Sequence, residues 1–118
     1  MTPEGFVKAL KETCSDAAVK DCLSNIQSPP GRKPDPSLVK LSNWYRGLEP
    51  QDQAHVLDVM RETASATLFG VLCVIDGVRA VEDSASKSEF KLTATRDGKE
   101  SVISPSYEHL HEIFKAEP

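Results

Sequence analysis

The side chains best suited to chemistry gather near the C-terminus, in the stretch EHLHE at residues 108–112. Glu108 and His111 are three residues apart, which places them on one face of a helix, and His109 and Glu112 share that spacing. Residues two apart on a helix point about 200° away from each other, so we expect that His109 and His111 do not bind the same ion. The Glu-x-x-His motif serves di-iron bundles, but there it recurs on a second helix with further glutamates. It occurs once here, so a solvated polar face is our main interpretation, with a metal site as the alternative.

The cysteine content indicates a reducing compartment. The chain has three cysteines, and an odd number cannot be fully paired within one chain. Cys14 and Cys22 belong to one predicted helix and are separated by about 12 Å of rise, which is too far for a disulfide. We therefore expect these residues and Cys73 to be small buried hydrophobic side chains. The N-terminal residues lack the basic start and apolar segment of a secretory signal, so we expect a cytoplasmic protein.

No sequence motif supports a particular reaction. The P-loop, the dinucleotide-binding G-x-G-x-x-G and the zinc motif H-E-x-x-H are absent, as is the nucleophile elbow G-x-S-x-G. His55 with Asp58 is no stronger a site than the C-terminal pairs. We therefore assign no catalytic, cofactor-binding or metal-ligating residue and expect no cofactor. Catalytic groups come together in space rather than along the chain, so the question of an enzyme stays open, with the balance against one.

Charge and aromatic residues favour a protein as the partner. The net charge is −4 and the pI is about 5.3, whereas binding to nucleic-acid phosphates needs a basic surface. Residues 27–36 contain four prolines and a glycine and form a predicted rigid loop that carries Arg32 and Lys33. We expect Trp44 in the core and the adjacent Tyr45 leaning outward. The candidate partner contacts are therefore Arg32, Lys33 and Tyr45.

Helical periodicity dominates the first part of the chain. Residues 2–27 form the first predicted helix. The second is capped by Asp35, begins at Pro36 and ends at Gly47. The third begins at Pro50. Each has apolar residues at steps of three and four. In the first helix, the predicted inward stripe consists of Val7, Leu10, Cys14, Ala18 and Cys22.

The least polar stretch is SATLFGVLCVIDGVRAV, residues 65–81. Its uncharged run, residues 63–75, is shorter than the roughly 20 residues that cross a bilayer, so we expect no membrane span. Asp76-Gly77 fits either a hairpin turn or a left-handed helix end. A helix is favoured because the helical period continues without a break, and a hairpin over residues 71–81 is the alternative. A helix that is apolar on all sides must be enclosed, by its own domain or in a homodimer core, and Gly70 fits the close approach of another helix.

The C-terminal part predicts a small sheet and a closing helix. A hairpin over residues 89–103 turns at Asp97-Gly98 and places Leu92 opposite Ile103. A third strand before it would make a meander. The closing helix, residues 104–118, begins at Ser104 or Ser106 and faces inward with Tyr107, Leu110, Ile113 and Phe114. The predicted fold class is α+β in a single domain, residues 1–118: three N-terminal helices with a long central apolar helix, an antiparallel hairpin or meander, and a C-terminal helix.

The segments LSNWYRGL and LFGVLCVIDGVRAVE, within residues 37–82, resemble a group of small bacterial proteins of no assigned function. This resemblance implies no activity and no site residue. In size, acidity and helix–hairpin architecture, the chain is also similar to bacterial immunity and antitoxin-type inhibitors. Our main hypothesis is a non-enzymatic protein-binding module, of the immunity-like, antitoxin-like or regulatory kind, that is able to form a homodimer. The alternative is a small metal- or ligand-binding enzyme that uses the C-terminal helix.

Overall fold

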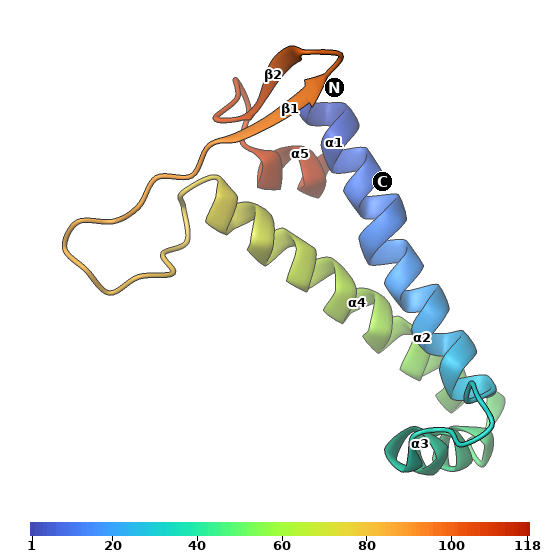
Figure 1. The fold of residues 1–118 in the computed structure, drawn as a ribbon. Coiled ribbons are helices and arrows are strands. Elements are labelled where there is room, and N and C mark those ends of the chain that lie inside the picture. The colour runs from blue at the N-terminus through green and yellow to red at the C-terminus, as the bar shows by residue number, and fades with distance from the viewer.

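Helices and one β-hairpin make up the protein, in a computed structural model that describes residues 1–118 (Figure 1). The N-terminal helical rod consists of α1 (Pro3–Leu10), the π-helix η1 (Lys11–Asp16) and α2 (Ala17–Gln27). Helices α3 (Pro36–Arg46) and α4 (Pro50–Ile75) follow, then strands β1 (Leu92–Arg96) and β2 (Lys99–Ser104), and finally α5 (Leu110–Ala116). The predicted α+β class is confirmed.

The rod and α4 diverge from the end where α3 lies, and α5 fills the space between them at the other end (Figure 1). The hairpin lies beside α1 at that same end. The hydrophobic core is therefore concentrated where α5 packs on α1 and α4, and β2 adds to it from beside α1. Its buried members are Val7, Leu68, Leu72, Ile103, Leu110, Ile113 and Phe114.

The helix caps follow the sequence signals. The Thr2 hydroxyl accepts a hydrogen bond from the backbone N–H of Gly5 at 3.0 Å. The Asp35 carboxylate accepts one from the backbone N–H of Ser37 at 2.8 Å, and Gly47 ends α3. These contacts satisfy N–H groups that have no partner within the helix.

The π-helical turns of η1 change which residues of the rod face the core. Its i→i+5 bonding places one more residue in a turn than an α-helix does. The buried face consequently runs from Val7 to Ser15 rather than to Cys14. Cys14 and Cys22 are exposed, so the expectation that they are buried is wrong, whereas Cys73 is buried as expected.

Helix α3 buries Tyr45, whereas Trp44 was expected to be the buried aromatic residue. Tyr45 is only 7% exposed and Ser42, one turn before it, is 1% exposed. Helix α3 packs on α2, and the Arg46 guanidinium donates to the carbonyl of Gln27 at 3.1 Å. Trp44 lies outside the face of Ser42 and Tyr45 and is 53% exposed, so its predicted place in the core is wrong.

The apolar stretch that begins in α4 is helical up to Ile75. Gly77 has a φ of +79°, the left-handed conformation of a helix end, and the hairpin alternative for this stretch is not observed. Leu68 and Leu72 face the core, but Val71 is 50% exposed, so the expected enclosure of the helix on all sides is absent in the single chain. None of the helices combines the length and apolar character needed to cross a membrane.

The β-hairpin has the predicted turn and a shifted register. Asp97 and Gly98 both have positive φ, at +52° and +77°, as a two-residue type I′ turn requires. A bulge next to the first residue of β1 pairs Leu92 with Ser104 instead of Ile103. The sheet has two strands, so the hairpin of the prediction is observed and the three-stranded meander is not.

Helix α5 begins later than predicted. Residues 105–109 precede it without helical structure, and its first residue is Leu110. Tyr107 therefore lies outside the helix and is fully exposed, which corrects its predicted inward position. Leu110, Ile113 and Phe114 are buried as expected.

Candidate functional site

The single chain leaves much more surface uncovered than a chain of its size normally does. Its accessible surface is 8593 Å², whereas the size relation for monomers gives about 6,300 Å², a difference of about 2,300 Å². The radius of gyration is 18.4 Å, against about 13.5 Å for a compact domain of this length. The exposed residues 77–91 contribute to this difference, but apolar faces of the helices contribute as well.

One such face is a stripe along α4 that we call the α4 seam. Thr63, Thr67 and the flanking Val71 are exposed, and the larger apolar members of the seam are only partly buried. The charged residues within this length of α4 lie on other faces, and two of them, Asp58 and Arg61, pair with each other at 3.8 Å. The seam consists of Val56, Met60, Thr63, Thr67, Gly70 and Val74, at alternating steps of four and three residues.

Gly70 is covered by an arginine side chain and not by another helix. A Cβ atom built on Gly70 would lie 2.4 Å from the Arg79 Nη1 atom. The chain turns back after α4, where the N–H groups of Val78 and Arg79 both donate to the carbonyl of Cys73. In the single chain, the close approach expected at Gly70 is therefore made by the Arg79 guanidinium.

The predicted partner contacts differ in their exposure to solvent. Arg32 and Lys33 are exposed in the loop before α3. Tyr45 is buried, so little of its side chain is available to a partner in this structure. The exposed aromatic residue of α3 is Trp44, and Leu41, one turn before it, is 42% exposed.

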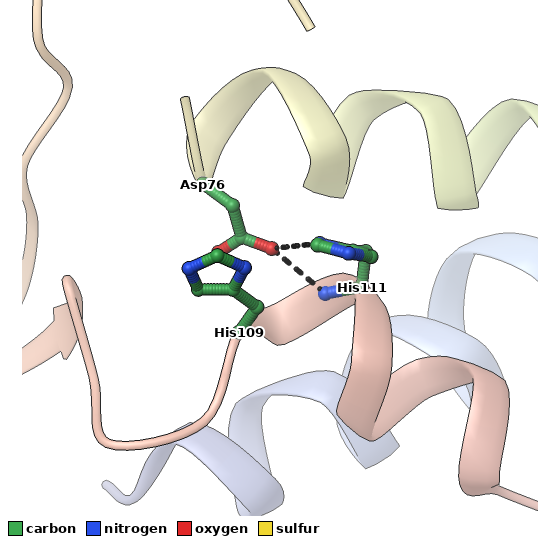
Figure 2. A group of neighbouring side chains, drawn as sticks. All are labelled: Asp76, His109 and His111. Atoms are coloured by element: carbon green, nitrogen blue, oxygen red, sulfur yellow. Dashed lines mark hydrogen bonds and ion pairs between the residues drawn. The ribbon is translucent and has the colours of Figure 1, made fainter. Parts of the chain in front are cut away.

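A polar cluster joins the end of α4 to the start of α5 (Figure 2). The Asp76 side chain is only 2% exposed, and one of its carboxylate oxygens accepts from the backbone N–H of Leu110 at 3.0 Å. The other oxygen accepts from the backbone N–H of His111 at 2.9 Å and lies 2.6 Å from the Nδ1 atom of the same residue. Asp76 therefore supplies the N-terminal cap of α5 from a distant part of the chain, in place of the predicted Ser104 or Ser106.

His109 lies beside this pair because it precedes the helix. Its backbone is extended, with φ −62° and ψ 141°, so the 200° separation that applies within a helix does not hold for His109 and His111. Their ring centroids are 5.2 Å apart, and potential ligand atoms of Asp76, His109 and His111 all lie within 4.8 Å of one another. The expectation that the two histidines point apart is wrong. Glu108 and Glu112 are exposed and are not part of the cluster.

The environment of His111 holds its ring in one orientation. Its side chain is 16% exposed, and its ring meets the edge of Phe69 at a centroid distance of 5.6 Å and an interplanar angle of 86°. A carboxylate accepts hydrogen bonds, so Asp76 favours the tautomer with a proton on Nδ1 and a free lone pair on Nε2. Asp76 and His109 both line a cleft of about 680 Å³, which gives the cluster access from solvent.

The comparisons with known proteins give no family for this chain. No family model, no curated protein and no solved structure matches it significantly. The functional interpretation therefore depends on the geometry of the α4 seam, the surface of α3 and the Asp76 cluster.

Proposed function

We propose that the protein is a protein-binding module that associates with a second copy of itself through the α4 seam. The main support is the uncovered surface of the single chain, about 2,300 Å² above the value for a compact monomer. Residues 77–91 account for part of this surface, but burial of only half of it by each of two chains would give an interface of about 2,300 Å², within the roughly 2,000–5,000 Å² of obligate homodimers.

The residue types of the seam fit a paired helix. Alternating steps of four and three residues give the 3.5-residue average spacing of a coiled-coil seam. The small side chains Thr63 and Thr67 in its centre permit two helices to approach closely. The Arg79 guanidinium covers only the part of the seam at Gly70. The length from Val56 to Thr67 is therefore the best site for contact between copies.

The homodimer is tested by measuring the molar mass of the wild type and two charge variants by sedimentation equilibrium. Thr67→Glu introduces a carboxylate in the seam, and Ala54→Glu introduces one at an exposed position of α4 outside it. We expect twice the chain mass of 12.9 kDa for the wild type and Ala54→Glu, and a large shift to monomer for Thr67→Glu. The proposal would be contradicted if the wild type stayed monomeric over a 100-fold range of protein concentration. It would also be contradicted if Thr67→Glu formed as much dimer as Ala54→Glu.

We further propose a role as an inhibitor or regulator of another protein, in the manner of immunity or antitoxin-type modules. Helix α3 exposes Trp44 and Leu41, and Trp44 is suited to anchor a partner protein. The loop before α3 adds the positive charges of Arg32 and Lys33. The chain is acidic overall, which favours a protein over nucleic acid as the partner. Its three free cysteines support a reducing compartment, and we propose a cytoplasmic location.

Partner binding is tested by co-expression with the product of each adjacent gene. An inhibitor protects the cell from a toxic neighbour and co-purifies with it in a fixed ratio. Trp44→Ala should weaken that complex at least tenfold without loss of folding, while Val59→Ala, a similarly exposed apolar position on α4, serves as the control. Equal weakening by both variants, or by neither, would argue against Trp44 as the anchor.

A further inference from the structure

We propose that His109 and His111 form a binding site for Zn²⁺, with Asp76 as the carboxylate that orients His111. The proposal is independent of the α4 seam, because the cluster lies at the junction of α4 and α5. It depends on three observations: the fixed ring of His111, the neighbouring ring of His109, and the buried carboxylate behind them.

The first step concerns the nitrogen that is free to bind. Asp76 lies 2.6 Å from Nδ1 of His111, so the proton of the neutral imidazole is held there and Nε2 is left as a ligand atom. Metal-binding histidines commonly donate their other N–H to a carboxylate, which fixes the ring and increases its basicity. Asp76 makes this contact with His111, and Phe69 supports the ring from the side.

The second step concerns the distance to the other ligand. In a tetrahedral site, zinc–nitrogen bonds of about 2.0–2.1 Å place the two nitrogens roughly 3.4 Å apart. The potential ligand atoms of the cluster lie within 4.8 Å of one another. The site requires the His109 ring to rotate until one of its nitrogens faces Nε2 of His111, and this side chain is exposed.

The third step concerns the choice of ion. Two imidazoles suit zinc and copper, whereas Mg²⁺ and Ca²⁺ prefer oxygen ligands. The buried carboxylate of Asp76 balances part of the positive charge and also faces the N-terminal end of α5. With two protein nitrogens, the remaining coordination positions are open to water from the adjoining cleft.

The test is a calorimetric titration of the full-length chain with zinc chloride. Cys14 and Cys22 are exposed thiols and are replaced by serine in every sample, so that they do not bind the metal. We expect one Zn²⁺ per chain, with at least a tenfold loss of affinity in His109→Gln and in His111→Gln. His55→Gln is the matched control, since His55 is exposed on α4 and lies outside the cluster; it should bind as the starting protein does. Mg²⁺ at the same concentration should not compete.

Imidazole NMR provides a second measurement that does not depend on affinity. Before zinc is added, the proton of His111 should be on Nδ1, and zinc should shift the Nε2 resonance of His111 and a ring nitrogen of His109. His109→Gln leaves the contacts of Asp76 in place, so it tests the site even if His111→Gln unfolds the chain. Undiminished zinc binding in folded His109→Gln, or shifts confined to His55, would overturn the proposal. Repetition in Thr67→Glu separates this site from the homodimer, because the monomer should bind zinc equally well.

Discussion

Replacement of Asp76 by alanine should destabilise the protein far more than its position in a turn would suggest. The carboxylate accepts two backbone N–H groups of α5 and contacts the ring of His111, and it is almost fully buried. Loss of a helix cap costs about 0.5–2 kcal/mol, and a hydrogen bond to a charged group contributes about 1.5–3 kcal/mol. Because Asp76→Ala removes both, we expect the free energy of unfolding to fall by about 3 kcal/mol and the melting temperature by roughly 10 °C.

The measurement is urea unfolding followed by circular dichroism, with all variants at one protein concentration, since association changes apparent stability. Asp58→Ala is the control. Its ion pair with Arg61 is exposed, and its loss should cost less than about 0.5 kcal/mol. A double-mutant cycle with His111→Ala should show a coupling energy of about 1–2 kcal/mol between Asp76 and His111. If Asp76→Ala costs no more than Asp58→Ala, or if the cycle is additive, Asp76 does not join α5 to α4 as the structure indicates.

Three further results are expected from other parts of the chain. A thiol reagent should label the two exposed cysteines of the native protein, and Cys73 only after unfolding; fast labelling of Cys73 would show that α4 is more open. Gly70→Ala should raise stability by up to about 1 kcal/mol through helix propensity, since only the flexible end of Arg79 has to move; a loss of more than 1 kcal/mol would mean that Arg79 is held there. The backbone N–H of Ser88 donates to the exposed Glu82 carboxylate and lowers the pKa of that group. The hydrogen bond is therefore fully formed above the ordinary pKa of glutamate, and it is lost as the pH falls through the lowered pKa of Glu82. The Ser88 amide shift should titrate below the range of an exposed glutamate, and a midpoint within that range would contradict the contact.

The elements of the fold were predictable where the signals are local. The Asp35 cap, Pro36 and Pro50 mark helix starts, and the Asp97-Gly98 turn marks the hairpin. The faces of the helices were less predictable. The π-turns of η1 rotate the buried face of the rod, and the stripe through Cys14 assumes a regular α-helix. Trp44 and Tyr45 are neighbours, so which of them is buried depends on how α3 packs against the rest of the chain, and the local sequence does not show this.

The cluster at Asp76 shows why the candidate site was missed. Asp76-Gly77 has the appearance of an ordinary helix end, and local spacing gives no link to residues 110–111, because the hydrogen bonds span 34 and 35 positions. Helical geometry argues against pairing His109 with His111, but it does not apply here, because α5 begins at Leu110, directly after His109. One sequence signal could have indicated the site: two histidines, two residues apart, on either side of a helix start. The first then has an extended backbone, and the angle between residues within a helix does not apply to the pair.

The buried carboxylate also links the zinc site to the stability of the fold. Zinc that binds the folded chain alone stabilises it by about 2.7 kcal/mol when the free ion is 100-fold above its dissociation constant. Thermal unfolding should therefore shift upward by roughly 10 °C in the starting protein and in His55→Gln, and the shift should vanish in His109→Gln, which keeps every contact of Asp76. Asp76→Asn should lower the metal-free melting temperature and also weaken zinc binding by about 10–100-fold, as loss of an orienting carboxylate does. A variant at Asp76 that loses stability but binds zinc with unchanged affinity would show that the carboxylate only caps α5, and that the orientation of His111 is maintained by Phe69 alone.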